Sequence, residues 1–473
     1  MCGQSISKVL LIGLDAVPPK LLFEDLIQSM PNVSNMIKNG LHGTLTSCHP
    51  PITVPAWTVM MSSKDPGTLG IYGFRHRRGA SYTNPWIVSS NSITHDRVWE
   101  VIEKYGKRST VIGVPPAYPP YRIQGKMISC FLTPGRPEQY TYPNELKHEI
   151  EKIVSEYKFD VLFRTEDRDT ILKEIYEMTE KRFEVIKKLI VENSWDFFVF
   201  MEIGTDRLHH AFWKFYDKTH PKYVPNNKYE QVIPEYYRYI DQKIGELLQL
   251  VDDATTIMVV SDHGTKGMRG AFCINEWLIK EGYLVLKRHP HEVTDIEKAD
   301  INWEETTAWG WGGYYARIFL NVKGREPQGI INQDDYDHFI DDLRSKMQEI
   351  RDPEGRKMNT FIFKPEEIYV KTAGDKPDLM VYFDDLFWRS AGTIGHGTFY
   401  LSENDTGPDD SVHSMDGIFI IYNPRHSAPS GTYGESGFPI TNNMSIYDIA
   451  PTILKLLDLN IPSDMQGKPL PNI

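Results

Sequence analysis

The sequence of 473 residues predicts an α/β fold in which a mostly parallel sheet lies between helices. Short apolar runs without alternation, rich in β-branched and aromatic residues, are typical of strands buried on both faces of such a sheet. Longer stretches with helical periodicity separate these runs. Since strand-like and helix-like segments alternate along the whole chain, we expect the strands to form one layered sheet.

The predicted elements extend from the N-terminal region to the C-terminal end. The expected strands are the apolar runs at 8–14, 109–114, 196–203, 255–260 and 417–422. Helices are expected where apolar residues recur every three or four positions, at 168–193, 236–251 and 445–459.

Two stretches interrupt the alternation of strands and helices. Residues 115–165 begin with PPAYPPY and contain further proline and glycine, so we expect them to leave the core. Residues 285–385 mix basic, aromatic and acidic residues and are expected to form an inserted cap or lid subdomain. The predicted domains are therefore a core made of residues 1–284 and 386–473, and the inserted cap subdomain of residues 285–385.

The composition is that of a globular protein, with 40% hydrophobic and 25% charged residues. The formal net charge of −12 argues against stable binding to nucleic acids or anionic membranes, since both need a cationic surface. It does not argue against small anionic ligands, because bound metal ions can reverse the local field.

The four cysteines, Cys2, Cys48, Cys130 and Cys273, show no CxxC spacing. Neither a disulfide framework nor a cysteine zinc site is therefore predicted. The N-terminal apolar run is too short for a signal sequence, and no stretch approaches about 20 consecutive apolar residues. We expect a cytoplasmic protein without a membrane span.

Acidic and imidazole side chains follow the expected strands. Asp15 follows the first run, Asp206 follows the third, Asp262 and His263 follow the fourth, and His413 precedes the last. In an open α/β sheet, ligands bind outside the carboxyl ends of the strands. A single Asp at a strand end is more often a turn or helix cap. Several strand ends that carry Asp and His together instead indicate a site for zinc or manganese.

The spacing of these residues limits which of them can share a metal ion. Asp206 and His210 are four residues apart, so a helix that begins there places both on one face. His209 points about 100° away and is expected to support the site or to lie at the surface. Asp262 and His263 are adjacent, so both can bind a metal only where the strand has ended.

Thr53 lies in the sequence PPITVPAWTV, directly before an expected helix. Its hydroxyl can cap that helix, or it can act as a nucleophile at the positive end of the helix. Metal coordination is one way to activate a threonine hydroxyl. The whole set is sufficient for two neighbouring divalent ions, the usual arrangement for displacement at phosphorus: Asp15, Thr53, Asp206, His210, Asp262, His263 and His413. This set favours the nucleophile over the helix cap.

Five motifs in one order carry a family resemblance: LIGLDA, TVPAWT, TDRLHHAFW, SDHG and HSMDG. The chain resembles the alkaline phosphatase superfamily, and within it the type I phosphodiesterase/nucleotide pyrophosphatase branch. NVKGREPQG and PDLMVYF also look like predicted phosphohydrolases or phosphomutases of this superfamily. The resemblance implies a doubly wound, alkaline-phosphatase-like α/β fold with an inserted cap subdomain.

The resemblance also implies roles for individual residues. One metal ion would be held by Asp15, Asp262 and His263, and another by Asp206, His210 and His413. Thr53 would contact the metals and attack phosphorus.

The sequence departs from the family pattern in one place. The diesterase branch usually has an asparagine after the nucleophile helix that contacts the phosphoryl oxygen, whereas this chain reads GIYGFRHRRG. The basic residues Arg75, Arg77 and Arg78 can hold the substrate instead, or they can form a solvated loop. His396 competes with His413 as the last metal ligand, and His413 is preferred because HSMDGIFI has the family's spacing between histidine and strand.

The leading hypothesis is a phosphohydrolase that cleaves a phosphodiester or pyrophosphate bond through Thr53, with two divalent ions, zinc before manganese. Its expected partner is a small anionic phosphoester, with nucleotides among the candidates. Trp309, Trp311, Tyr314 and Tyr315 can stack on a nucleobase, but packing within the inserted subdomain is favoured.

Other activities stay open as alternatives. A phosphomutase or phosphomonoesterase of the same superfamily is one, although such mutases generally use serine. A sulfatase is disfavoured because TVPAWT lacks the C/S-x-P-x-R pattern of sulfatases. A non-catalytic metal-binding scaffold would be expected to lack a ligand or the nucleophile, and none is missing.

Overall fold

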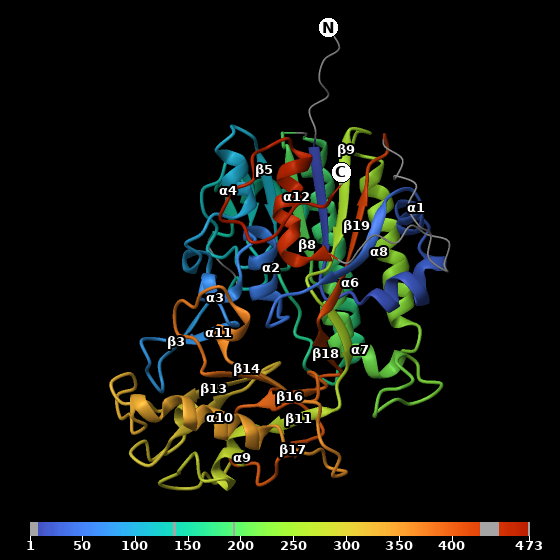
Figure 1. Cartoon of the computed structure of the whole chain (residues 1–473). Helices are drawn as coiled ribbons and strands as arrows, with labels where there is room; N and C mark the ends of the chain where they lie inside the picture. Colours follow the sequence, from blue (N-terminus) through green and yellow to red (C-terminus); the bar gives the residue numbers. More distant parts are fainter. Residues whose placement is uncertain (1–7, 136–138, 193, 426–443, 472–473) are drawn as a thin grey trace.

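The computed structural model describes residues 8–135, 139–192, 194–425 and 444–471. These residues form a larger lobe around a long sheet and a smaller lobe at one end of that sheet (Figure 1). Within this part of the chain, no helix is both long and apolar enough to cross a membrane. Cys48, Cys130 and Cys273 are buried free thiols, and Cys2 lies outside the described residues.

The larger lobe contains a nine-stranded sheet with the order β20-β2-β19-β9-β1-β8-β5-β6-β7. The strands are β1 (Lys8–Leu14), β2 (Leu41–Thr46), β5 (Ser109–Ile112), β6 (Gly125–Ile128), β7 (Thr141–Tyr142), β8 (Phe197–Glu202), β9 (Thr255–Val260), β19 (Asp416–Tyr422) and β20 (Met444–Ser445). Strands β9, β1, β8, β5 and β6 run parallel, whereas β19 is antiparallel to β9 and β2. The predicted α/β class with a mostly parallel sheet is confirmed, and all five expected strands form.

Helices cover the sheet on both faces (Figure 1). One group consists of α2 (Thr53–Ser62), α4 (Val98–Glu103) and α12 (Ile449–Leu456). The other consists of α1 (Pro31–Asn39), α6 (Arg168–Val191), α7 (Gly204–Tyr216) and α8 (Val232–Leu248). The side chains of β8 and β9 are buried along their whole length, as expected for strands with helices on both faces.

The expectation that residues 115–165 leave the core is wrong. Strands β6 and β7 extend the main sheet, and α5 (Leu146–Ile153) follows them. The prolines occupy the connection between β5 and β6, where no ladder hydrogen bond is lost. The proline-rich connection before them is the reason why the short strands β6 and β7 were not predicted.

The smaller lobe has its own hydrophobic core, whose buried side chains come from Tyr82 and from residues 272–394. It contains a four-stranded sheet, β12-β13-β15-β14, and a three-stranded sheet, β16-β11-β17. Its elements are β11 (Gly270–Cys273), α9 (Ile274–Lys280), β12 (Ala308–Trp311), β13 (Ala316–Leu320), α10 (Tyr336–Met347), β14 (Phe361–Phe363), α11 (Pro365–Ile368), β15 (Leu379–Tyr382), β16 (Trp388–Ala391) and β17 (Tyr400–Leu401).

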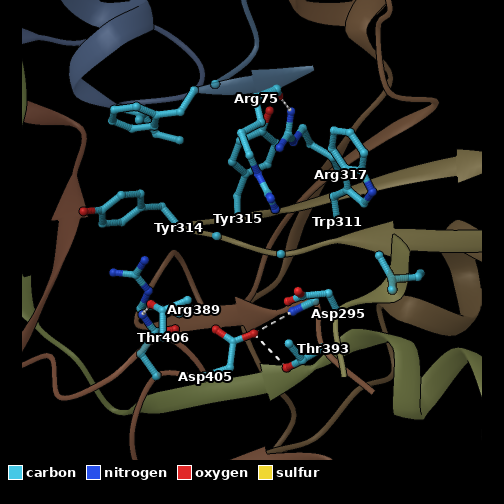
Figure 2. A pocket seen from close by; sticks show the side chains of 18 of the residues that line it. Arg75, Asp295, Trp311, Tyr314, Tyr315, Arg317, Arg389, Thr393, Asp405 and Thr406 are labelled. Atoms are coloured by element: carbon cyan, nitrogen blue, oxygen red, sulfur yellow. Dashed lines mark hydrogen bonds between the residues drawn. The ribbon is translucent and has the colours of Figure 1, made fainter. Parts of the chain in front are cut away.

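Short elements join the two lobes. They are α3 (Pro66–Leu69), β3 (Arg75–Arg77), β4 (Pro85–Ile87), β10 (Gly264–Gly267) and β18 (Ser411–Ser414). A cavity of about 450 Å³ is lined by residues of both lobes (Figure 2).

One edge of the main sheet collects the ends of several strands. The carboxyl ends of β1, β8 and β9 lie there because these strands are parallel. The carboxyl end of β2 and the start of β19 lie at the same edge, because β19 is antiparallel to both β2 and β9. Five chain segments therefore leave or enter the sheet next to one another on the side of the smaller lobe (Figure 1).

Gly13 in β1 makes room for the indole ring of Trp57 in α2. A Cβ atom at this position would overlap that ring and would lie 2.9 Å from the carbonyl oxygen of Phe200. The Trp57 side chain is fully buried, and its Nε1 donates a hydrogen bond to Oδ2 of Asp15 at 3.0 Å. The glycine thus permits the contact that holds the first strand-end carboxylate.

We expect Gly13→Ala to lower the free energy of unfolding by about 1–3 kcal/mol, because the core cannot accept the added methyl group without moving Trp57. Urea denaturation measures the change. Gly73→Ala is the matched control, since a Cβ there would lie 3.7 Å from its nearest neighbour. Its effect should stay within about 0.5 kcal/mol. Equal destabilisation by the two substitutions would contradict the close approach at Gly13.

Candidate active site

The strand-end residues predicted from the sequence meet at one edge of the main sheet. Asp15 follows β1 directly, and α7 begins just after β8, so its first two turns carry Asp206 and His210. Asp262 and His263 follow β9. His413 lies in β18, just before β19, and Thr53 is the first residue of α2. All seven side chains are buried.

The three carboxylates share one pattern of contacts. Each has one oxygen atom held by a protein donor: Trp57 Nε1 binds Asp15 at 3.0 Å, and Arg207 Nη1 binds Asp206 at 2.6 Å. A backbone N–H lies 3.4 Å from Oδ1 of Asp262. The second oxygen of each carboxylate is buried and has no hydrogen-bond partner among the described residues.

The three imidazoles follow a matching pattern. Nδ1 of His210 lies 2.7 Å from Oδ1 of Asp409. Nδ1 of His263 and Nδ1 of His413 lie 3.0 and 2.8 Å from backbone carbonyl oxygens. An Nδ1–H that donates to such an acceptor leaves the lone pair on Nε2 free, which is how most histidine metal ligands are held.

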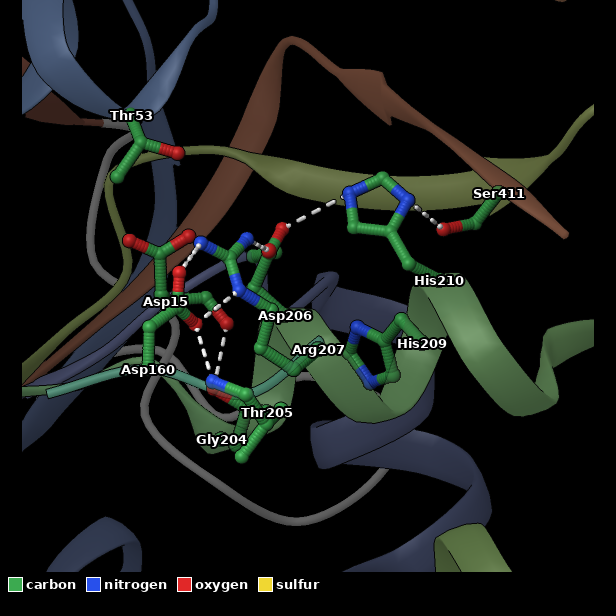
Figure 3. Close-up of polar contacts among 12 residues, drawn as sticks. Asp15, Thr53, Asp160, Gly204, Thr205, Asp206, Arg207, His209, His210 and Ser411 are labelled. Carbon is green, nitrogen blue, oxygen red and sulfur yellow. Dashed lines mark hydrogen bonds and ion pairs between the residues drawn. The ribbon is translucent and has the colours of Figure 1, made fainter. Parts of the chain in front are cut away.

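Two overlapping groups of donor atoms result, and Figure 3 shows Asp206 and His210 of the first group and Asp15 of the second. Nε2 of His210 and Nε2 of His413 lie 3.2 and 3.6 Å from Oδ1 of Asp206. Each of these residues offers a ligand atom within 4.8 Å of the other two. The first group is therefore compact enough for one metal ion.

The second group lies on the other side of Asp206. Nε2 of His263 lies 3.6 Å from Oδ1 of Asp15 and 3.3 Å from Oδ2 of Asp262. Asp15, Asp206 and His263 offer ligand atoms that all lie within 4.8 Å of one another. Asp206 thus belongs to both groups, which places the two candidate metal positions side by side.

Thr53 points into the second group. Its Oγ1 lies 3.4 Å from Nε2 of His263. The residue before it, Ile52, occupies the N-cap position of α2, and no side chain among the described residues caps this helix. The Thr53 hydroxyl therefore faces the candidate metal ligands and makes no capping contact.

Two other histidines lie outside these groups. Nδ1 of His209 lies 3.1 Å from the Thr265 hydroxyl, and its Nε2 lies 3.0 Å from the Tyr237 hydroxyl, so both ring nitrogens are occupied. Figure 3 shows the His209 ring on a different side of α7 from His210. His396, the competitor of His413, lies 2.7 Å from the Thr393 hydroxyl in a loop of the smaller lobe.

The cavity between the lobes adjoins the two groups of donor atoms. Tyr314 and Arg207 connect the two regions, because both line the cavity. The Tyr314 hydroxyl lies 3.0 Å from Nε2 of His210, and Arg207 contacts Asp206. A substrate in this cavity can therefore place a phosphoryl group beside the candidate metal ligands.

The arginines of the GFRHRRG segment differ in position. Arg75 lines the cavity, with half of its side chain exposed. Arg77 is buried against Asp375 at 2.6 Å and Glu326 at 3.3 Å, and it does not line the cavity. Arg78 is exposed and also lies outside the lining. Of the three predicted substrate contacts, only Arg75 is in a position to reach a ligand in this cavity.

Three polar residues of this site were not predicted from the sequence: Arg207, Asp409 and Tyr314. Arg207 binds both Asp206 and Asp160, and Asp409 holds Nδ1 of His210. Only the place of Asp409 just before His413 hinted at its role. Tyr314 was expected to pack within the inserted subdomain; it does pack against a hydrophobic cluster that includes Tyr315 and Tyr382, but its ring also stacks on His413 at 3.7 Å. By contrast, Trp309, Trp311 and Tyr315 are buried.

A protein-family model for type I phosphodiesterases/nucleotide pyrophosphatases matches residues 9–409. The chain belongs to the type I phosphodiesterase/nucleotide pyrophosphatase family. This phosphodiesterase family member is accordingly a hydrolase that acts on phosphoric ester bonds. The matched range includes six of the seven predicted site residues; His413 lies four positions beyond it.

Solved structures share the fold of this family member. Human ectonucleotide pyrophosphatase/phosphodiesterase 5 has a TM-score of 0.57 and 14% identity, covering 98% of this chain and 97% of its own. The murine protein has a TM-score of 0.52 and 16% identity, covering 96% of both chains. These matches show the alkaline-phosphatase-like fold. A comparison with curated protein sequences gave no match.

Burial controls the ionisation of the second group. It raises the pKa of Asp15 and of Asp262 well above the usual range, and neighbouring carboxylates raise both further. Burial also lowers the pKa of His263 well below its usual value. In metal-free protein these effects favour the protonated form of the two aspartates and the neutral form of His263.

The first group ionises differently because its charges lie close together. Burial opposes protonation of His210, but Asp409, Tyr314 and Asp206 together raise the pKa of His210 well above its usual value. Burial likewise opposes ionisation of Asp206, but His210 outweighs it and holds the pKa of that carboxyl well below its usual range. Burial lowers the pKa of His413 to about 4.

We expect zinc binding to metal-free protein to release protons, because ligands must lose their protons to bind a metal. Asp15, Asp262 and His210 have raised pKa values, so they carry protons that the metal displaces, and zinc affinity should rise with pH. Calorimetry in two buffers of different ionisation enthalpy counts these protons.

Asp15→Asn should reduce the number of protons released, and His209→Gln is the matched control that should leave it unchanged. Affinity that stays constant or falls as pH rises would contradict the assignment of protons to these groups.

Proposed function

We propose that the protein is a metal-dependent phosphodiesterase that uses Thr53 as its nucleophile and two divalent ions as cofactors. The main support for this proposal is that the donor atoms of the site all point toward the same region. Three carboxylate oxygens without a hydrogen-bond partner and three imidazole Nε2 atoms face one small region next to the Thr53 hydroxyl. Buried carboxylates without a partner are costly, so this arrangement fits bound cations.

The donor set fits two ions of the zinc or manganese type. Imidazole and carboxylate together suit both metals, and zinc is the first choice. In this proposal one ion is held by Asp15, Asp262 and His263, and the other by Asp206, His210 and His413. Such a pair of ions, when bound, lowers the pKa of a coordinated hydroxyl and neutralises charge on the phosphoryl oxygens.

Thr53 is in the position that a nucleophile requires. Its hydroxyl lies at the first residue of α2, where the helix dipole and free N–H groups favour a phosphate group. Thr53 Oγ1 forms a bond to phosphorus while the bond to the leaving oxygen breaks. The hydroxyl proton passes to water, and the leaving oxygen takes a proton from water. A water molecule then cleaves the threonine–phosphorus bond and restores the hydroxyl.

Tyr314 and Arg207 are the donors nearest to the reacting group in this proposal. The family's asparagine is absent from GIYGFRHRRG, whereas the Tyr314 hydroxyl reaches Nε2 of His210 at 3.0 Å. Arg389 lies over the Tyr314 ring at 4.1 Å and fixes its position. Tyr314 is therefore proposed to donate to a phosphoryl oxygen in place of the asparagine.

A small anionic phosphoester is the proposed substrate class, with nucleotides first. A solved structure of an inactive murine ectonucleotide pyrophosphatase/phosphodiesterase 5 is a complex with AMP, with a TM-score of 0.52 and 15% identity over 96% of both chains. The cavity of about 450 Å³ has the size of a small-molecule site. Its aromatic lining residues include Phe163 and Trp311.

The test compares variants of two threonines on α2, with bis(4-nitrophenyl) phosphate as the substrate and added zinc or manganese. Thr53→Ala should lower turnover by at least about 10³-fold while the bound metal and the fold remain. Thr53→Ser keeps the hydroxyl and should retain measurable turnover, because metal activation acts on the oxygen atom.

Thr58→Ala is the matched control. Thr58 is also buried, but its hydroxyl donates to the carbonyl oxygen of Val54 and does not face the site. A phosphoryl adduct trapped on the Thr53 peptide should appear in wild type and in Thr58→Ala, and should be missing from Thr53→Ala. Wild-type turnover by Thr53→Ala would overturn the proposed nucleophile.

A further inference from the structure

Arg317 is a buried cation that lines the cavity without an acidic partner. Its side chain belongs to β13, and the residue is 7% exposed. Among the described residues, no carboxylate oxygen lies within 4.0 Å of its guanidinium nitrogens. In the described part of the chain, its Nη1 donates one hydrogen bond, to the backbone carbonyl of Arg75.

The other arginines that line the cavity all have acidic partners. Arg207 pairs with Asp160 at 2.7 Å and with Asp206. Arg164 and Arg389 pair with Asp409 at 3.3 and 2.8 Å. Each of these three cations contacts a carboxylate, whereas Arg317 contacts none among the described residues.

Arg75 lies close to Arg317 (Figure 2). Its Nη2 is 3.9 Å from Oε1 of Glu297, at the limit of an ion pair. The two guanidinium groups lie near one indole ring: that of Arg317 is 5.1 Å and that of Arg75 is 5.8 Å from the ring of Trp311. Trp311 is the cross-strand partner of Arg317 in the β12–β13 pair. The ring thus supports both cations on one wall of the cavity.

Folding alone does not explain this arrangement. A buried cation without a partner destabilises a protein, and burial lowers the pKa of the Arg317 guanidinium. The nearby carboxylates of Asp375 and Glu297 oppose this shift, but Asp375 is held by Arg77 at 2.6 Å, and Glu297 lies within ion-pair distance of Arg75 and not of Arg317. A ligand with negative charge would supply the missing partner.

The position of Arg317 relative to the candidate metal-binding residues determines how long an anionic molecule must be to contact both. Tyr314, which contacts His210 and His413, precedes Arg317 by three residues and lies in the bend just before β13. Three residues span at most about 10 Å along the chain. Both side chains line the same cavity. One molecule bound in this cavity can therefore contact Arg317 and the region around the candidate metal-binding residues at the same time.

We propose that Arg317, with Arg75, binds a second anionic group, a carboxylate or a phosphate, at the end of the substrate remote from the scissile phosphorus. This proposal rests on the proposed function for the place of the scissile phosphorus. It narrows the substrate class to phosphoesters or anhydrides that carry a further negative charge. A planar guanidinium favours carboxylate and phosphate oxygens because it can donate two parallel hydrogen bonds.

The test measures binding and does not depend on turnover. Phenylphosphonate and 4-(carboxymethyl)phenylphosphonate differ only in the distal carboxymethyl group, which carries the second negative charge. Calorimetry with zinc-loaded wild-type protein should show at least about tenfold tighter binding of the carboxylated ligand, since hydrogen bonds to charged groups are strong. Arg317→Met should reduce this ratio to about one while phenylphosphonate binds as before. Arg317→Lys should give an affinity ratio between those of wild type and Arg317→Met. The positive charge remains, but a lysine cannot donate two parallel hydrogen bonds as the guanidinium does.

Arg288→Met is the matched control, because Arg288 is an exposed arginine of the same lobe outside the cavity. It should leave the ratio at its wild-type value. The two phosphonates are compared within one variant, so a partial loss of folded protein affects both alike. An unchanged ratio in Arg317→Met would overturn the proposal, as would equal weakening of both ligands or no binding of either one to wild type. None of these results depends on Thr53, whose variants test the proposed function separately.

Discussion

The rest of the site depends on one constraint: three carboxylates are buried together at one edge of the sheet. Asp15, Asp206 and Asp262 each direct one oxygen without a hydrogen-bond partner toward the same region. Burying an ionised carboxylate costs several kcal/mol even after the protein relaxes. Burial raises the pKa of Asp15 and of Asp262, which favours their protonated forms unless a cation is supplied. In the proposed function, bound divalent ions would offset this cost, which is why the site and its cofactors are considered together.

The fold meets this constraint through parallel strands. Because β1, β8 and β9 run in the same direction, Asp15, the start of α7 and Asp262 reach one edge without long loops. Contacts from more distant segments then fix each donor: Trp57 binds Asp15, and Asp409 binds His210. The smaller lobe adds Tyr314 to this edge and forms much of the cavity wall with Arg317. The larger lobe therefore provides most of the candidate metal ligands, and the smaller lobe provides much of the cavity wall that the proposal assigns to the remainder of a substrate.

The sequence alone predicted those parts of the site that depend on a strand and the residues directly after it. Apolar runs marked the strands, and Asp and His residues that follow three of these runs marked candidate ligands, since strand direction brings those residues together. Asp409 and Tyr314 could not be found in this way, because they reach His210 from positions 199 and 104 residues away along the chain. Arg77 and Arg75 look alike in GFRHRRG, but only tertiary packing decides that Arg77 is buried against Asp375 while Arg75 faces the cavity. The short strands β6 and β7 were missed because the prolines before them dominated the local pattern.

Anomalous X-ray diffraction at the zinc edge, from crystals grown with zinc, tests the central claim most directly. Two strong anomalous peaks should lie at this edge of the sheet. One peak should be within bonding distance of Asp15, Asp262 and His263, and the other within bonding distance of Asp206, His210 and His413. The absence of both peaks, or zinc bound only at surface histidines such as His148, would contradict the account.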